Sequence, residues 1–490
     1  MLGMKPEIIP YQPEVDLVLD DSVGERRPHL PVYQETHEVN GVQFWKTEDI
    51  PLSRRNFIYR PCLPNPLFTE LGYCTTEYPF DTSGVNIQDR SYGMSVLRGE
   101  NSVVSVRAKD GWRTARSDVC IKEGDVYWEV EVLNVGNGSG SSSGSGTGSG
   151  SGSNVDVDVD MDVDKGSVQQ RRQFLNSSAH VRVGISRREA SLEGPVGFDS
   201  YGYGLRDFSL ESIHDGQLEQ VLARAPLKNG DRLGFLVSLP SVERQVAQAR
   251  EYTARRIEAL ASHGKELGAQ EEWESHGRKR QKRAGVTNMD FQRALLEDID
   301  HANVVRDHIP IRYKNQLFYE ATDYVKTTKP EYYSSDKRER EEYYHLEGSY
   351  VAVFLNGEYL GKAFEEVKPF LPPFSELQYN EKFYYGYWKH GRAEGEDREE
   401  ARIGGKHRKG LILRNKYVNN SKLGYYPTIS CFKGGAARLV TTRSELRHLR
   451  AATDVADQPV AVLDDLYRRQ IADEVVWDIV DEIEEEAKVK

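Results

Sequence analysis

The segment 350–361 is the strongest local folding signal in this chain. Its Asn356-Gly357 pair lies between two apolar stretches, and Asn-Gly is the preferred sequence for the type I′ turn of a β-hairpin. Other strand-like stretches are 126–133 and 180–185, which alternate apolar and polar residues, and the short runs 233–237 and 426–432. Short strands bounded by turn residues, without helical segments between them, predict a mainly β protein built as an antiparallel β-sandwich.

Three segments interrupt the strand series, and we expect each to be a loop insertion in a single β domain. The first, about 134–178, holds a Gly/Ser tract and Val-Asp repeats, either natural low complexity or an engineered linker, and cannot bury a core. The second, about 241–345, is charged and prone to helix, and the third, about 379–420, mixes Tyr with charged residues. The predicted organisation is an extended Pro-rich N-terminal arm packed on the domain (1–85), the β domain with its insertions (86–445), and a linker with a C-terminal helix (446–490).

The composition of the 490 residues argues against several classes of protein. With 65 Lys and Arg against 77 Asp and Glu, the net charge is −12, which disfavours nucleic-acid binding through bulk positive charge but is compatible with a local basic patch. No run of about 18 apolar residues is present, so we expect no membrane-spanning helix, and the N-terminus has no apolar signal core. The four cysteines are widely spaced, without a Cys-x-x-Cys pair, which argues against a zinc module and a disulfide scaffold. We therefore expect an intracellular, soluble chain without a metal or other cofactor.

Motifs for catalysis are missing from the sequence. It contains no His-Glu-x-x-His, no Walker loop and no strand-borne Gly-x-Gly-x-x-Gly. Its Gly-x-Ser-x-Gly matches lie only inside the Gly/Ser tract, where no strand-to-helix turn can form. We predict that the chain is not an enzyme and has no small-molecule substrate; an enzyme with a diverged site stays an alternative that a turnover screen would decide.

The C-terminal end of the chain has the periodicity of a helix. Apolar residues recur at intervals of four and acidic residues fill the opposite side, which predicts an amphipathic helix. The apolar stripe comprises Leu463, Leu466, Tyr467, Ile471, Val475, Val476, Ile479, Val480 and Ile483. Such a stripe can lie in a partner's groove or pack on the chain's own sandwich, and both readings stay open.

Several short motifs follow one another along the predicted strands. They are Gly124-Asp-Val-Tyr-Trp-Glu129, His180-Val-Arg-Val-Gly-Ile-Ser186, Pro195-Val-Gly-Phe-Asp-Ser-Tyr-Gly-Tyr-Gly204, Gly230-Asp-Arg-Leu-Gly234 and Phe354-Leu-Asn-Gly357. In order and content they resemble the SPRY domain family, in which a Gly-x-x-Tyr-(Trp/Phe)-Glu strand is typical. The resemblance spans roughly 100–435, and the ordered set is more specific than any single block.

Three further features narrow the resemblance. They are the segment 192–206, the lead-in Tyr59-Arg-Pro-Cys-Leu63, and a terminal helix that contains Leu466-Tyr467. Together they are similar to the Ash-type subunit of COMPASS, the complex that methylates lysine four of histone H3. Animal members carry an N-terminal zinc module and winged helix; this sequence has no Cys/His clusters for the zinc module and so resembles the shorter fungal form. The DNA-reading role of the animal members is not carried over.

The resemblance implies a pocket for an acidic, phosphorylatable peptide of the complex's WD40-propeller subunit. The positions that match the family's motif are Trp112, Arg182, Pro195, Phe198 and Arg206, and the family usually has Tyr at the first and fourth of them. Strand alternation independently places Arg182 on the face opposite the apolar residues of its strand. Two guanidinium groups can bind carboxylate or phosphate bidentately. The plain alternatives are a solvated strand arginine at 182 and core aromatics at Trp112 and Phe198.

The resemblance also implies that the terminal helix docks the small dimeric helical subunit of COMPASS. The anchors would be Leu466, Tyr467, Ile471, Val475, Ile479 and Ile483. A separate basic run consists of Arg278, Lys279, Arg280, Lys282 and Arg283. This run is compatible with a nuclear import signal, with a solvated face of an inserted helix, or with contact to nucleosomal DNA phosphates, and the sequence does not separate the three.

These expectations combine into a non-catalytic scaffold and regulatory subunit of a histone H3 lysine-4 methyltransferase complex, located on chromatin in the nucleus. It would hold the WD40 subunit and the helical dimer and so support the active arrangement of a SET-domain subunit carried by another chain. The alternative from another class is a SPRY substrate receptor of a ubiquitin ligase. That alternative predicts an adaptor-binding box or RING cysteines, and neither is visible in the sequence.

Overall fold

The structure of the chain is a computed structural model. The structure describes residues 33–47, 57–61, 82–98, 100–136, 178–223, 226–274, 301, 308–313, 316–322, 345–371, 374, 385–387, 411–413 and 423–489. The Gly/Ser tract, the basic run 278–283 and most of the third insertion lie outside these residues, so what we expect of them stays a prediction.

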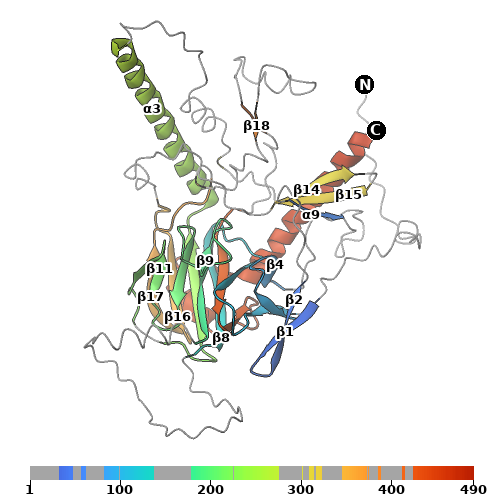
Figure 1. Ribbon diagram of the computed structural model, residues 1–490. Coiled ribbons are helices and arrows are strands. Elements are labelled where there is room, and N and C mark those ends of the chain that lie inside the picture. Colours follow the sequence, from blue (N-terminus) through green and yellow to red (C-terminus); the bar gives the residue numbers. More distant parts are fainter. Residues whose placement is uncertain are drawn as a thin grey trace.

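Two large sheets form the predicted antiparallel sandwich (Figure 1). The larger sheet has the order β1 (Tyr33–Val39), β2 (Val42–Thr47), β5 (Ser95–Leu97), β6 (Glu100–Ser105), β21 (Ala436–Val440), β8 (Gly124–Asn134), β13 (Arg232–Leu239), β16 (Tyr350–Leu355) and β17 (Glu358–Glu365). The smaller sheet has the order β12 (Gln217–Glu219), β11 (Ser212–His214), β10 (Gly202–Arg206), β9 (His180–Ser186), β20 (Tyr426–Phe432), β7 (Arg113–Ser117) and β4 (Val85–Arg90). A short strand, β22 (Val460–Val462), joins the larger sheet by pairing parallel to β8.

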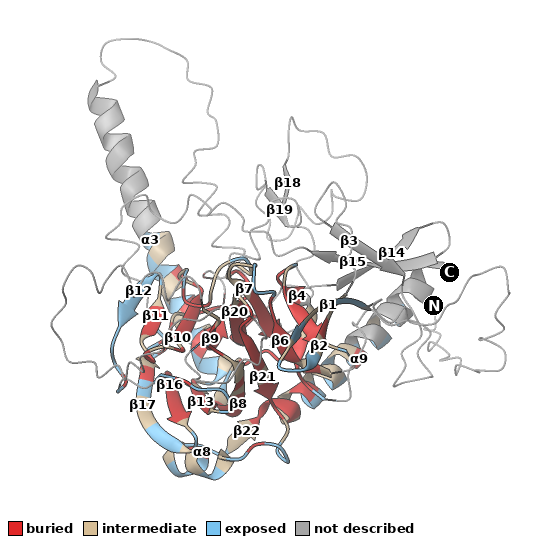
Figure 2. Ribbon diagram, turned by 60° about the horizontal axis from the view of Figure 1, so that its bottom comes forward, coloured by how far each residue is buried: buried red, intermediate tan, exposed pale blue. Residues whose placement is uncertain are grey.

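The core lies between the two sheets, where alternate strand residues meet (Figure 2). From β8 it takes Val126, Trp128, Val130 and Val132, and from β9 it takes Val181, Val183 and Ile185, all at most 1% exposed. Trp128 stacks on Phe235 of β13 with ring centroids 5.5 Å apart. The alternation in both segments therefore predicted the buried face of each strand correctly.

The predicted half-buried strand β8 is in fact buried on both faces. Its other face carries Tyr127 and Glu129, both 0% exposed, under a layer made by α8 (Leu449–Val455) and β22. Glu129 accepts hydrogen bonds from Arg232 Nη1 at 3.0 Å and from the backbone N–H of His448 at 2.7 Å. Because this buried carboxylate is satisfied by the covering segment, the stretch expected to be a linker, from 446 onward, is a layer of the domain.

Two Asn-Gly pairs that join paired strands form hairpin turns with positive φ at both residues. Asn356 and Gly357 have φ of 50° and 89° between β16 and β17, which confirms the predicted type I′ turn. Asn40 and Gly41 have φ of 49° and 79° between β1 and β2. The predicted extended arm is therefore, over 33–47, a hairpin that lengthens the larger sheet.

The second insertion contains more structure than the charged helix that we expected. Its helix, α3 (Val242–Glu274), begins against the sandwich, where Val242 and Val246 pack on the core, and points away from it (Figure 1). It also contains the hairpin β14 (His308–Tyr313) and β15 (Gln316–Thr322), which pairs with β3 (Phe57–Pro61) to form a separate small sheet. The third insertion contributes β18 (Tyr385–Tyr387) and β19 (Leu411–Leu413).

Candidate peptide-binding site

Four polar side chains form a row across the smaller sheet, on the face that points away from the core. The row consists of Thr114 on β7, Ser430 on β20, Arg182 on β9 and Arg206 on β10, which the strand register makes successive neighbours. We call this face the outer face. Since directly paired residues on neighbouring strands have Cβ atoms about 5 Å apart, the two arginines lie side by side.

The loop between β9 and β10, residues 187–201, folds back over this row. Val196 N–H donates to Ser430 Oγ at 2.9 Å, and Thr114 Oγ1 donates to Gly194 O at 2.6 Å. A Cβ at Gly204 would lie 2.6 Å from Val196 O, so only glycine lets the loop approach the strand this closely. The Gly-rich motif that suggested the family therefore serves to seat a loop on the sheet.

Arg182 lies between this loop and an aromatic pair. Its guanidinium carbon is 5.0 Å from the ring centroid of Trp112, which itself stacks on Phe432 at 5.2 Å. Arg182 Nη1 donates to Val196 O at 3.5 Å, while its buried Nε has no hydrogen-bond partner. Among the described residues no carboxylate forms an ion pair with Arg182. Burial and the neighbouring charge of Arg206 lower the pKa of Arg182 to about 10.

Arg206 differs from Arg182 because it already has a carboxylate partner. Its Nη1 lies 2.6 Å from Glu211 Oε2, and the two side chains are 22% and 16% exposed. Ser209 Oγ donates to the same carboxylate oxygen at 2.8 Å. Glu211 was not among the predicted site residues, because its contact with Arg206 depends on the shape of the turn between the two residues.

The two remaining residues of the predicted set belong to the covering loop. Pro195 is half-buried, and its carbonyl oxygen accepts the N–H of Phe198 at 3.0 Å. Phe198 is 62% exposed and is therefore not a core aromatic. The structure places Arg182 and Arg206 side by side in the row, Trp112 against Arg182, and Pro195 and Phe198 in the loop above. We refer to these five residues as the arginine site. Leu218 of β12, 52% exposed and on the outer face two strands from Arg206, is an apolar neighbour that we had not predicted.

The terminal helix α9 (Leu463–Val489) divides into two halves with different surroundings. In the first half Leu463 and Tyr467 belong to the sandwich core, and Leu466 and Ile471 pack against it. Val475 is also buried, at 7% exposure. In the second half Val476, Ile479 and Ile483 are 57%, 38% and 41% exposed. The anchors predicted at Leu466, Tyr467 and Ile471 therefore pack on the chain's own fold, whereas Val476, Ile479 and Ile483 are exposed.

Neither a metal site nor a membrane span is found in the part of the chain that the structure describes. No group of three or more His, Cys, Asp and Glu side chains there is arranged to hold a metal ion. No described helix is both long and apolar enough to cross a membrane.

Fold and site together define a β-sandwich protein whose smaller sheet carries two neighbouring arginines, with a tryptophan beside them, on its outer face. The chain is 54% identical to COMPASS component BRE2 of Saccharomyces cerevisiae over 506 residues, which covers 98% of this chain and 99% of that protein. It is 26% identical to Set1 complex component ash2 of Schizosaccharomyces pombe, covering 95% of this chain and 51% of that protein. COMPASS component cclA of Aspergillus fumigatus is also 26% identical, over 92% of this chain and 62% of that protein. The chain belongs to the family of COMPASS components that includes BRE2, as the resemblance of its motifs implied.

Family models and solved structures do not identify the family of this chain. No family model matches the chain. The SPRY domain of human HERC1 aligns with 74% of this chain and all of that domain, at 10% identity and a TM-score of 0.29, which does not establish a shared fold. The evidence for the β-sandwich is the strand pairing within its two sheets.

Proposed function

We propose that this chain is a non-catalytic scaffold subunit of a COMPASS-type complex that methylates lysine four of histone H3 on chromatin in the nucleus. The arginine site binds an acidic or phosphorylated peptide of a WD40-propeller subunit, and the second half of α9 binds a small dimeric helical subunit. By holding both partners, the chain favours the active arrangement of a SET-domain subunit on another chain.

The observation that carries the first interaction is the pair of neighbouring arginines on the outer face. Arg206 is already paired with Glu211, but the neighbouring Arg182 forms no ion pair among the described residues, so a ligand's anion can bind its guanidinium group. Trp112 provides an aromatic surface beside Arg182, which suits a peptide that presents an acidic and an apolar side chain together. The exposed ring of Phe198 and the exposed side chain of Leu218 extend this apolar surface.

The second interaction is supported by the exposed apolar side chains of α9. Val476, Ile479 and Ile483 are spaced by three and four residues, which puts them on one face of the helix. An amphipathic helix with such anchors fits the groove of a helical partner. Because the first half of α9 is packed on the sandwich, a partner bound to the second half is held in a fixed direction from the arginine site.

The experiment that tests the proposal reconstitutes the complex from purified subunits and measures methylation of histone H3. We expect no methyltransferase activity from this chain alone and a clear rise when it joins the SET-domain and WD40 subunits. Arg182→Ala/Arg206→Ala should reduce the rise. The control is Arg107→Ala, which removes an exposed arginine paired with Asp110 of its own turn at 2.8 Å and should leave the rise unchanged. Activity of the isolated chain, or an unchanged rise with the arginine variant, would contradict the proposal.

A further inference from the structure

The carboxylate of Glu211 occupies the place where a ligand's anion would meet Arg206. Glu211 Oε2 is 2.6 Å from Arg206 Nη1 and accepts a second hydrogen bond, from Ser209 Oγ, at 2.8 Å. Both side chains of the ion pair are largely buried, so water screens it less than a surface pair. An incoming peptide therefore meets one arginine that is already paired.

The turn between β10 and β11 fixes Glu211 in this position. Arg206 N–H donates to Glu211 O at 3.1 Å, and Leu210 N–H donates to Arg206 O at 2.9 Å. Leu210 has a φ of +52°, a backbone conformation that leucine rarely adopts, and it is fully buried in the core. A buried leucine in an unfavourable backbone conformation closes the turn, so the return of Glu211 to Arg206 is part of the fold and not a chance surface contact.

The arginine pair is consequently asymmetric. Arg182 forms no ion pair with a carboxylate among the described residues, and its Nε has no partner, whereas Arg206 is neutralised by Glu211. The other nearby acid on the loop, Glu193, is paired with Arg113 at 3.0 Å. The row therefore presents one guanidinium group without an ion-pair partner among the described residues, that of Arg182, beside the ring of Trp112. The buried carboxylate of Asp207, which accepts the N–H of Val181, offsets part of its charge.

We propose that Glu211 is a specificity-determining residue of the arginine site, an internal carboxylate that competes with the ligand for Arg206. The proposal rests on the proposed binding of an acidic peptide at this site. The ligand's first anionic group binds Arg182, and contact with Arg206 requires Glu211 to move aside. Because only one guanidinium group of the site lacks an ion-pair partner among the described residues, the site favours a carboxylate-bearing segment and gains little from a phosphate, whose second charge is repelled by Glu211.

The test uses the full-length chain and two fluorescein-labelled peptides in fluorescence anisotropy at about 0.15 M salt. One peptide has the centre Asp-Glu-Asp flanked by Leu and Tyr; in the other, phosphoserine replaces the central Glu. Glu211→Gln removes the competing charge and should tighten binding of the acidic peptide about fivefold or more, and binding of the phosphopeptide by a larger factor. Glu211→Asp keeps the charge but shortens the reach to Arg206, so its affinity should lie between those of wild type and Glu211→Gln.

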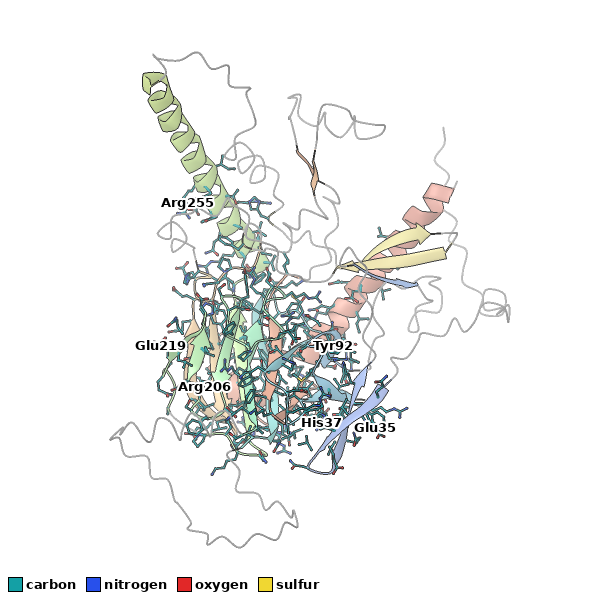
Figure 3. The ribbon with its side chains drawn as sticks, in the orientation of Figure 1. Glu35, His37, Tyr92, Arg206, Glu219 and Arg255 are labelled. Atoms are coloured by element: carbon teal, nitrogen blue, oxygen red, sulfur yellow. The ribbon has the colours of Figure 1, made fainter. Side chains whose placement is uncertain are left out.

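Glu219→Gln is the matched control. Glu219 is exposed on β12 and is paired in register with Ser212. Its side chain therefore lies on the face of the β11–β12 hairpin that is opposite to the outer face. Arg206 and Glu219 lie toward the same side of the sandwich, away from His37 and Tyr92 (Figure 3). The control removes the same charge from the same hairpin and should change either affinity less than twofold.

The outcomes separate this proposal from the function on which it rests. If the acidic peptide binds wild type, loses affinity with Arg182→Ala, and binds Glu211→Gln no more tightly, the role of Glu211 is wrong and the proposed site stands. Equal tightening by Glu219→Gln and Glu211→Gln would also overturn it, because net charge alone would then explain the effect. If neither peptide binds any of these folded variants, or if binding survives Arg182→Ala, the proposed function of the site fails together with the inference.

Discussion

Gln470 of α9 bonds to both backbone polar groups of Cys120. Its Nε2 donates to Cys120 O at 2.6 Å, and its Oε1 accepts Cys120 N–H at 3.1 Å. A side-chain amide thus pairs with a segment of the sandwich as a neighbouring strand would. Together with the buried Leu463 and Tyr467, this bidentate contact makes the first half of α9 part of the domain.

Replacing Gln470 should therefore destabilise the sandwich. Gln470→Ala removes both hydrogen bonds between this side chain and the backbone of Cys120, and we expect the free energy of unfolding in urea to fall by about 1–3 kcal/mol. The neighbouring exposed Arg469 is the control, and Arg469→Ala should change it by less than about 0.5 kcal/mol. Equal stabilities of the two variants would mean that α9 is attached only loosely.

Shortening the chain should separate folding from docking. A chain that ends at residue 455 lacks β22, Leu463 and Tyr467 and should lose its cooperative thermal transition. A chain that ends at Val475 keeps these contacts and should melt within a few degrees of the full-length protein, yet fail to bind the helical partner. Circular dichroism during heating distinguishes the two; a cooperative transition in the shorter chain would contradict the assignment of 456–471 to the domain.

The buried ion pair between Asp89 and Arg116 should make stability depend on pH in the acid range. Burial by itself would raise the pKa of Asp89, but the charge of Arg116, 2.6 Å away, holds it below its ordinary value. A carboxyl group with a lowered folded-state pKa contributes stability above its unfolded pKa of about 3.9 and loses it as the pH falls through the folded value.

Asp89→Asn should thus lower the free energy of unfolding at pH 7 by about 3–5 kcal/mol, because Arg116 is left buried and unpaired. The difference from wild type should shrink as the pH falls below about 4. Urea unfolding over a pH series measures both effects, with the exposed carboxylate variant Asp454→Asn as control. A difference that stays constant with pH would show that the charge of Asp89 is not the cause.

The ring of Trp112 should matter for peptide affinity more than for folding. Trp112→Leu keeps an apolar side chain but removes the aromatic face beside Arg182, and we expect acidic-peptide binding to weaken about threefold to tenfold. Trp45→Leu removes an equivalent contact, with Arg98 at 5.1 Å on the larger sheet, and should leave the affinity unchanged. Anisotropy with the Asp-Glu-Asp peptide makes the comparison, and equal losses in both variants would remove Trp112 from the site.

The sequence predicted features that depend on neighbouring residues and missed those that depend on distant ones. Alternation in 180–186 gave the outward direction of Arg182, and Asn356-Gly357 located a hairpin because both residues tolerate positive φ. Asn40-Gly41 carries the same signal, but the many prolines of residues 1–85 led us to expect an extended arm there. The parallel pairing of β22 with β8 joins segments more than 300 residues apart, and no local pattern announces it.

The candidate site shows the same division. Motif and alternation identified the two arginines. The contact of Glu211 with Arg206 depends on a turn in which Leu210 has a positive φ, a conformation that leucine disfavours, and no sequence pattern predicts such a turn. Periodicity identified the stripe of α9 but not the point at which the sandwich ends. Ile471 packs on the core and Ile479 does not, and that difference is set by the size of the sheet beneath the helix.

The most direct test of the scaffold role is quantitative mass spectrometry of proteins captured with the tagged full-length chain from its native cell. Wild type should bring down a SET-domain protein, WD40 proteins and a small helical protein. Arg182→Ala/Arg206→Ala should lose a WD40 protein and keep the small helical one, and Ile479→Asp/Ile483→Asp should do the reverse. Capture of ubiquitin-ligase components in place of these partners, or an unchanged set of partners with both variants, would contradict the account.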